Sequence, residues 1–375
     1  MITIRRATLE DKPAIFAFLE KAYGDKARYK YPERWEWQFE KNPYKPNDEL
    51  PVFIAVTEDG QVVGQSAAMY EPLKIEQESQ ILAWALDAYV LEAYRGQNLG
   101  FETLRINCEN HPLWMGMVMA PSSRHILLKL GCQPTDQVTA FRRIAQIDPD
   151  SLWIGLQNRT LDKHLLRKFG TFLVKNLRFS YLGAWFINTG VNIHDFLISS
   201  RIDKNIKIQE CTTISDEFDK FWKKIRGKFS IIVERNSTFL TWKYHNQPNM
   251  NYKIFTAHKN GEMTGYIILR FAKPPESNTG IIADILADPD DRATLAALIN
   301  TAVRQFKAEN LKYISAASSI PAYQRAYRIA GFLKQKEIVP LLHNRCENPS
   351  YRCLFDSGHW FLGRSDHDWD QFPYA

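Results

Sequence analysis

Hydrophobic positions along the chain follow two different spacings, and each spacing predicts one kind of element. Alternating or short continuous apolar runs predict strands, whereas apolar residues three and four positions apart predict helices. In the first part of the chain, strands are predicted at 2–7, 51–58, 61–76, 80–92, 114–120 and 133–144. Helices are predicted there at about 9–23, 32–41, 98–110 and 123–130.

The same order of elements returns later in the chain. Strands are predicted at 206–211, 252–258, 263–272, 280–287, 311–317 and 333–342. Helices are predicted at about 214–226, 236–246, 291–309 and 320–330. Each copy places antiparallel strands first and a β-α-β-α-β run last, so the pattern predicts a tandem of two similar α+β domains.

Short motifs support the repeat. A W-x-[FY]-x-x-x-P pattern occurs at 37–43 and again at 242–248. A hairpin signal follows each one, Asp59-Gly60 in the first copy and Asn260-Gly261 in the second. The spacing from Gly64 to Gly131 is 67 residues, and the spacing from Gly265 to Gly331 is 66 residues. Two unrelated segments are not expected to keep that spacing.

The first copy contains a loop with the chemistry of a phosphate site. The strand at 80–92 is apolar except for Asp87, and it leads into residues 94–100, which read Tyr-Arg-Gly-Gln-Asn-Leu-Gly. A helix follows directly. Free backbone N–H groups and the positive end of the helix dipole favour an anion at such a junction. Gly96 and Gly100 allow close approach of a ligand to the backbone, and Arg95 adds a positive charge.

This loop resembles the acetyl-CoA loop of the GNAT N-acetyltransferases, R/Q-x-x-G-x-G/A, with Arg95 in the first position and Gly100 in the last. Asn98 stands where the family has its middle glycine, and Asn tolerates the left-handed region. The resemblance extends over both copies and implies two tandem GNAT-like domains, each a mixed, mostly antiparallel sheet flanked by helices. The predicted boundaries are 1–145 for the domain with the acetyl-CoA loop, 146–200 for a helical connector, 201–345 for a degenerate GNAT-like domain and 346–375 for a tail.

The resemblance also implies roles for individual residues. Acetyl-CoA, or another acyl-CoA, would be the acyl donor. Its phosphates would lie on Arg95, Gly96, Gln97, Asn98, Leu99 and Gly100, and its pantetheine arm would pair with the strand residues Tyr89, Val90 and Leu91. A carboxylate on this strand would be the base for the incoming amine. Asp87 is the first candidate, because apolar neighbours would raise its pKa toward neutrality, and Glu92 is the second.

The usual proton donor of the family is missing from the first copy. The family often has a tyrosine four residues before the glycine of its last helix; Leu127 occupies that place in the first copy and Tyr327 in the second. Ser122, Ser123 and His125 are possible substitutes. The second copy has three aspartates and no glycine at 287–293, which would repel a pyrophosphate, so we expect one CoA site, in the first copy.

Composition limits the remaining choices. The net charge of +6 is too diffuse for a nucleic-acid protein, and five scattered cysteines without a C-x-x-C pair indicate a reducing compartment. The sequence shows no signal-peptide pattern and no bilayer-spanning run, so we expect a cytoplasmic protein without membrane or nucleic-acid partners. The basic amphipathic stretch 161–169 is interpreted as a helix packed across the domain junction rather than on a membrane. Residues 366–368, Asp-His-Asp, are not expected to hold a metal, because adjacent side chains converge poorly on one ion.

Two functions remain in view. The first is an acyl-CoA-dependent N-acyltransferase, with acetyl-CoA as donor and a small-molecule or peptide amine as acceptor. The alternative is a non-catalytic CoA-binding or interaction module that keeps the tandem fold. Release of free thiol in the presence of amines would distinguish them.

Overall fold

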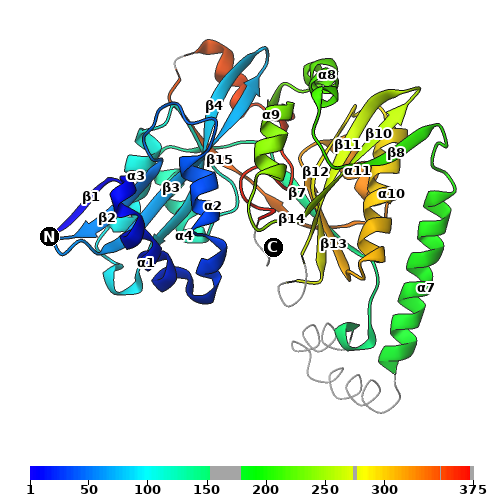
Figure 1. The fold of residues 1–375 in the computed structure, drawn as a ribbon, viewed down its shortest axis with the longest axis horizontal. Helices are drawn as coiled ribbons and strands as arrows, with labels where there is room; N and C mark the ends of the chain where they lie inside the picture. The colour runs from blue at the N-terminus through cyan, green and yellow to red at the C-terminus, as the bar shows by residue number, and fades with distance from the viewer. Residues whose placement is uncertain (153–178, 273–276, 347, 372–375) are drawn as a thin grey trace.

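Two β-sheets lie side by side in the computed structural model, each flanked by helices (Figure 1). The structure describes residues 1–152, 179–272, 277–346 and 348–371. Both sheets are mixed and mostly antiparallel, which confirms the predicted α+β class. Of the described helices, none is long and apolar enough to cross a bilayer. The basic stretch 161–169 lies outside the described residues.

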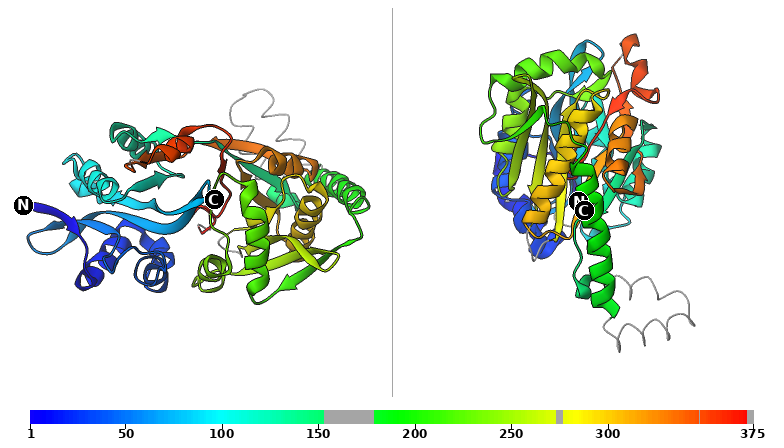
Figure 2. Two further views of the ribbon diagram at one scale, coloured as in Figure 1. Left: turned by 90° about the horizontal axis from the view of Figure 1, so that it is seen from above. Right: turned by 90° about the vertical axis from the view of Figure 1, so that its right-hand side faces the viewer.

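The first sheet has its main strands in the order β1-β2-β3-β4-β5-β15-β6. Their bounds are β1 Ile2–Arg6, β2 Val52–Thr57, β3 Val62–Ile75, β4 Glu78–Val90, β5 Leu113–Gly116, β15 Leu341–Asn344 and β6 Gln133–Pro134. Two further strands extend it at β3, namely β9 Ile231–Val233 and β16 Trp360–Phe361. Its helices are α1 Lys12–Tyr23, α2 Glu33–Trp35 with a π-helical turn Glu36–Glu40, α3 Leu99–Glu109 and α4 Pro121–Lys129. Helices α1 and α2 cover one face and α3 and α4 the other (Figure 2, left).

The second sheet has the order β14-β7-β13-β12-β11-β10-β8. The strands are β14 Leu333–Ile338, β7 Val138–Ile144, β13 Tyr313–Ser318, β12 Thr279–Ala287, β11 Glu262–Phe271, β10 Tyr252–Lys259 and β8 Ile206–Cys211. The helices are α7 Phe179–Ser199, α8 Asp216–Ile225, α9 Ser237–Leu240 with a π-helical turn Thr241–His245, α10 Arg292–Ala308 and α11 Pro321–Ile329. Short 3₁₀ segments are Leu9–Asp11, Gly24–Tyr29, Glu92–Tyr94, Arg226–Lys228 and Pro349–Phe355.

The two halves exchange their last strands, which the sequence analysis did not anticipate. The single strand predicted at 133–144 is divided into β6 and β7, and the one predicted at 333–342 into β14 and β15. Strand β7 crosses to the second sheet and pairs with β13 and β14, whereas β15 crosses to the first and pairs with β5 and β6. Pro134 and Pro340 stand at the two crossings, where a residue without an N–H interrupts a ladder. The predicted domain boundaries at 145 and 345 therefore do not separate the two sheets, because each sheet includes a strand from the other half of the sequence.

The repeated tryptophan motif is where the two halves meet. The rings of Trp37 and Trp242 stack with their centroids 4.9 Å apart, and Nε1 of Trp37 donates to the backbone oxygen of Trp242 at 2.9 Å. Both rings are buried. The two residues hold equivalent places in the two copies, so the repeated motif packs one half against the other.

The C-terminal tail is part of the core. Residues 360–371 are buried, and they lie between the two sheets (Figure 2, left). Their side chains bind both halves: Asp366 pairs with Arg235 at 2.7 Å, and Asp368 pairs with Arg34 at 3.1 Å. Asp366 and Asp368 thus pair with different arginines, and no group of three potential ligands positioned for a metal occurs among the described residues.

Candidate active site

A bulge in β4 opens the first sheet. Asp87 has a φ of 50°, in the left-handed region that few non-glycine residues adopt, and the register of β4 against β3 shifts beside it. In the described structure, β4 pairs with β5 only through Ala83–Trp114 and Trp84–Met115. Beyond the bulge the two strands separate, which leaves the edge of β4 open to a ligand.

A cavity of about 820 Å³ lies outside this opening, between β4, α3 and α4. Seven of the nine residues predicted to bind CoA line it: Tyr89, Val90, Arg95, Gly96, Asn98, Leu99 and Gly100. We call this cavity the outer cleft. Leu91 and Gln97 do not line it; Leu91 packs beneath the loop against the small cluster of Ala55, Val63 and Leu99.

The outer cleft suits an anion. Its lining contains no Asp or Glu among the described residues, but it contains Arg95 and, from α4, His125 and Lys129. Arg95 is held in place because Nη2 donates to Oη of Tyr89 at 3.2 Å and Nε to the backbone oxygen of Val90 at 3.3 Å. The sequence analysis missed Lys129, since a lysine at the end of a helix carries no local signal of a ligand.

The loop geometry explains the departure from the glycine motif. Asn98 is the residue before α3 and has φ 60° and ψ 6°, a left-handed conformation that Asn adopts more easily than most residues. Gly96 also has a positive φ, 85°. Asn98 therefore supplies a left-handed backbone position directly before α3, and Leu99, Gly100 and Phe101 at the start of that helix line the outer cleft.

A second cavity, of about 200 Å³, continues from the outer cleft toward the centre of the protein. Four residues line both cavities: Ala88, Leu104, Ala120 and Ser123. We call this second space the inner cavity. A flexible arm that enters along β4 would reach it between the bulge and the N-terminal turn of α4, where Ser123 offers a hydroxyl.

Asp87 lies in the inner cavity, but its surroundings differ from those expected. The sequence predicted apolar neighbours, whereas the structure pairs Asp87 with the buried ammonium of Lys30. Lys30 in turn lies 4.9 Å from the ring centroid of Tyr23, which lines the same cavity. Burial raises the pKa of Tyr23, and the charge of Asp87 adds to this effect. Lys30 and Tyr23 come from a segment that is distant in sequence from Asp87, so no local motif indicated that they would line this cavity.

Glu92, the second candidate base, lies elsewhere. Its side chain is 91% exposed, it lines neither cavity, and its carboxylate is 4.0 Å from Arg95. A side chain in this position is surrounded by water and faces away from the inner cavity. Its role as a base stays a prediction that the geometry does not support.

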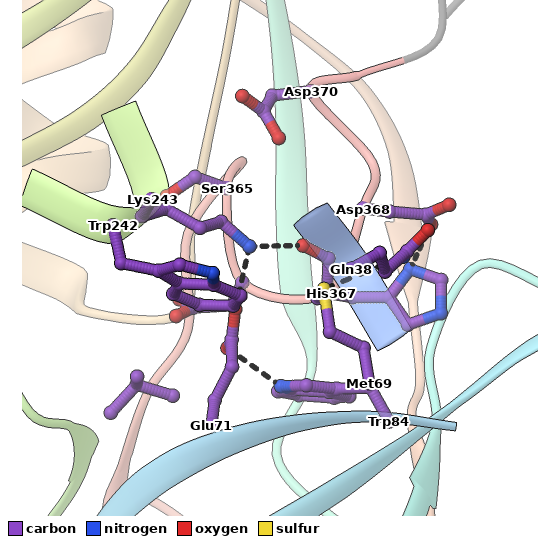
Figure 3. Close-up of polar contacts among 12 residues, drawn as sticks. Gln38, Met69, Glu71, Trp84, Trp242, Lys243, Ser365, His367, Asp368 and Asp370 are labelled. Carbon is purple, nitrogen blue, oxygen red and sulfur yellow. Dashed lines mark hydrogen bonds and ion pairs between the residues drawn. The ribbon is translucent and has the colours of Figure 1, made fainter. Parts of the chain in front are cut away.

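The tail closes the inner end of the site. His367 and Asp368 line the inner cavity, and His367 Nδ1 lies 2.6 Å from a carboxylate oxygen of Asp368 (Figure 3). Nε2 of His367 donates to the backbone oxygen of Ala85 at 2.9 Å. Burial lowers the pKa of His367, but the adjacent carboxylate outweighs it, and the net pKa is raised. With Nε2 bonded to β4 and Nδ1 against the carboxylate of Asp368, His367 fastens the tail to β4.

The place equivalent to the inner cavity is nearly filled in the second half. The cavity there measures about 10 Å³. The side chain of Tyr323 occupies the edge of β12. The Tyr323 hydroxyl donates to the backbone oxygen of Ala287 at 2.5 Å and accepts from the backbone N–H of Ala287 at 2.9 Å. At the start of α10, the Asp291 side chain accepts a hydrogen bond from the N–H of Thr294 at 3.0 Å and so caps the helix.

Tyr327 is a core residue of the second sheet. It is buried against Phe141 and Phe332. In the described structure its hydroxyl has no hydrogen-bond partner, and burial raises its pKa. It lies in the second half and does not line the inner cavity.

We therefore expect Tyr327→Phe to keep the melting temperature or to raise it. Removing a buried hydroxyl without a partner relieves a desolvation cost of about 1 kcal/mol. Differential scanning calorimetry measures this directly, and a clear loss of stability would show that the hydroxyl has a partner in solution.

Comparison with solved structures agrees with this geometry. A GCN5-related N-acetyltransferase from Anabaena variabilis aligns with 92% of this chain and 73% of its own, at a TM-score of 0.57 and 10% identity. An N-myristoyltransferase from Saccharomyces cerevisiae with bound myristoyl-CoA aligns with 92% of this chain and 82% of its own, at a TM-score of 0.55 and 11% identity. The chain has the GNAT fold. The GCN5-related N-acetyltransferase from Kribbella flavida aligns similarly, over 91% of this chain and 70% of its own, at a TM-score of 0.57 and 12% identity.

Sequence comparisons gave no further assignment. No family model matches the chain, and no curated protein matches it significantly. The GNAT fold is thus recognised through its three-dimensional arrangement, in which the tandem predicted from the sequence is present with exchanged strands.

Proposed function

We propose that the protein is an acyl-CoA-dependent N-acyltransferase, with acetyl-CoA as donor and a small-molecule or peptide amine as acceptor. The observation that carries this proposal is the continuity of the outer cleft with the inner cavity across the Asp87 bulge. The first offers cations and helix N–H groups to the phosphates of CoA, and the second offers a buried carboxylate. The small volume of the inner cavity favours a short acyl group over a long one.

In this proposal the reaction proceeds in a ternary complex. Asp87, directly or through a water molecule, accepts a proton from the substrate ammonium. The free amine attacks the thioester carbon, a C–N bond forms, and the C–S bond breaks. Backbone N–H groups at the open edge of β4 would polarise the carbonyl. The nitrogen loses its second proton as the C–S bond breaks, and the departing thiolate takes up one proton, with Ser123 at the junction of the two cavities as the candidate relay.

Two observations favour the alternative, a CoA-binding module without turnover. Leu127 replaces the tyrosine that the family uses as proton donor, and Asp87 is paired with Lys30. Both readings share the CoA site and differ only in the chemistry. Thiol release with a panel of amines separates them.

We expect isothermal titration calorimetry to give one CoA site per chain. Gly100→Asp should weaken CoA binding roughly tenfold or more, because it adds a negative charge where the pyrophosphate would lie. Ala293→Asp, at the equivalent place in the second half, should change the affinity little. Gly100→Ala is the control for shape, since a Cβ at Gly100 would meet Cγ2 of Val90 at 3.7 Å, an ordinary contact. Two equivalent sites per chain would contradict the assignment.

A further inference from the structure

Lys30 is a buried lysine at the wall of the inner cavity. Three lysines of the described structure are buried: Lys30, Lys74 and Lys243. Lys74 donates to two backbone oxygens, and Lys243 donates to Glu71. Neither of these two lines the inner cavity or the outer cleft, whereas Lys30 lines the inner cavity. Lys30 is thus a buried amine that borders the space proposed for an acyl donor.

The ammonium of Lys30 holds the place that the proposed reaction gives to the acceptor. It is bonded to the carboxylate of Asp87, and the side chains of Lys30 and Asp87 are 6% and 7% exposed. The ring centroid of Tyr23 lies 4.9 Å from this ammonium, a cation–π contact that keeps it at the cavity wall. An incoming ammonium would need the same carboxylate, so the lysine of the chain itself is the first amine at the proposed base.

The acyl donor would meet this lysine where the two cavities join. Ala88, the residue after Asp87, lines both the outer cleft and the inner cavity. An acyl-CoA with its phosphates in the outer cleft would therefore bring its thioester to the part of β4 that carries Asp87. An amine and a thioester held in one enclosed space react far faster than the same groups in dilute solution.

We propose that Lys30 is an acyl acceptor, so that the chain acylates its own lysine. This inference rests on the proposed function, because the donor and the base are the same. Asp87 takes one proton from the ammonium, and the free Nζ attacks the thioester carbon. As the N–C bond forms and the C–S bond breaks, the nitrogen loses a second proton and the thiolate takes one up. The products are CoA with a free thiol, an amide on Lys30 and one proton released to solvent.

This modification would occur once per chain. An amide is a much weaker acyl donor than a thioester, so Lys30 keeps the acyl group and loses its positive charge. Asp87 then lacks the counter-charge of Lys30 and is open to the ammonium of an external amine. We therefore expect about one equivalent of thiol per chain before any amine is added, followed by amine-dependent release.

Peptide mapping by mass spectrometry tests the proposal, after the full chain is incubated with acetyl-CoA and no amine. We expect the acetyl group on Lys30. Lys12 is the matched control: its ammonium is bonded to Glu40 at 2.5 Å and lies 5.5 Å from the ring centroid of Trp35, yet its side chain is 24% exposed and lines neither cavity. Acetylation at Lys30 should exceed that at Lys12 roughly tenfold or more, because only Lys30 shares an enclosed space with the donor.

Lys30→Arg provides the second line of evidence. Arginine keeps the positive charge but does not form the amide, so the added acetyl mass and the single equivalent of thiol should both disappear while CoA still binds. Should this variant fail to fold, the peptide map of the wild type decides. An unmodified Lys30 in a chain that binds acetyl-CoA overturns the proposal. Acetylation of Lys12 to the same extent as Lys30 also overturns it, because it indicates unassisted reaction in solution.

Thiol release with external amines separates this proposal from the proposed function. Turnover of amines while Lys30 stays unmodified overturns only the acylation of Lys30. Modification of Lys30 without turnover of any amine supports the acylation of Lys30 and contradicts transfer to external acceptors. Neither reaction, in a chain that binds CoA, contradicts both.

Discussion

Asp87→Asn is expected to lower kcat about a hundredfold or more while CoA affinity stays close to that of the wild type. Asp87 faces the inner cavity and lies outside the lining of the outer cleft, so its carboxylate acts on the acceptor and not on the phosphates. A general base contributes in the transition state, and its loss therefore appears in kcat. Asn can keep the left-handed backbone at this position, and its amide oxygen can still accept from Lys30. Steady-state kinetics with calorimetry of CoA binding measures both effects.

Glu92→Gln is the matched control for this prediction. Glu92 carries the same charge a few residues further along but is exposed to water, and we expect its substitution to leave kcat within about twofold. If Asp87→Asn folds and turns over at the wild-type rate while Glu92→Gln does not, the base has been assigned to the wrong carboxylate. If neither substitution changes kcat, proton removal occurs without a protein carboxylate from this strand.

Lys243→Met is expected to destabilise the protein by about 3–5 kcal/mol. The ammonium of Lys243 is fully buried and donates to Glu71 at 2.5 Å and to the backbone oxygen of His367 at 2.9 Å (Figure 3). Its removal leaves the buried carboxylate of Glu71 without its counter-charge, with only Nε1 of Trp84 at 2.7 Å, and such a loss is among the most costly single changes. It also releases a bond that holds the tail at the inner cavity. Denaturant unfolding gives the free energy.

The pH dependence of this loss has a definite sign. Burial raises the pKa of Glu71, and Lys243 opposes that rise. Without the ammonium the pKa rises further, so the folded variant binds a proton that the unfolded chain does not hold at the same pH. The stability of Lys243→Met should therefore increase, relative to the wild type, as the pH falls.

Lys253→Met is the control for Lys243→Met. Lys253→Met removes a partly exposed ion pair with Glu309 at 3.4 Å and should cost less than about 1 kcal/mol. A loss for Lys243→Met that is as small as this, or that grows toward low pH, would contradict a buried, charged pair between Lys243 and Glu71.

Local patterns in the sequence predicted most of the fold, because the hydrophobic spacing and the turn residues of each segment agree with the element that the segment forms. Strand β8 was expected at 206–211 and has those bounds, and the loop at 94–100 was recognised from glycine, arginine and the strand before it. The left-handed conformation of Asn98 followed from the chemistry of its side chain. Such features depend on neighbours in sequence, and they can be inferred without knowledge of the tertiary structure.

Features that depend on distant segments were not predictable. Strand exchange joins β7 to β13 and β15 to β5, pairings that no local pattern specifies. The partners of Asp87 and Ala85, namely Lys30 and His367, come from segments far away along the chain. The sequence analysis set residues 346–375 apart from both domains as a tail, whereas residues 360–371 are buried and Asp366 and Asp368 pair with Arg235 and Arg34. The prolines at 134 and 340 were the one available signal of the exchange.

Thiol release from acetyl-CoA in the presence of a panel of amines, with the acylated product identified by mass spectrometry, tests the central claim most directly. The account predicts amine-dependent release in which thiol and amide appear in equal amounts, much reduced in Asp87→Asn and lost at low acetyl-CoA in Gly100→Asp. A protein that binds one CoA per chain in calorimetry, yet releases no thiol with any amine or acyl-CoA, would contradict the catalytic proposal and identify a CoA-binding module.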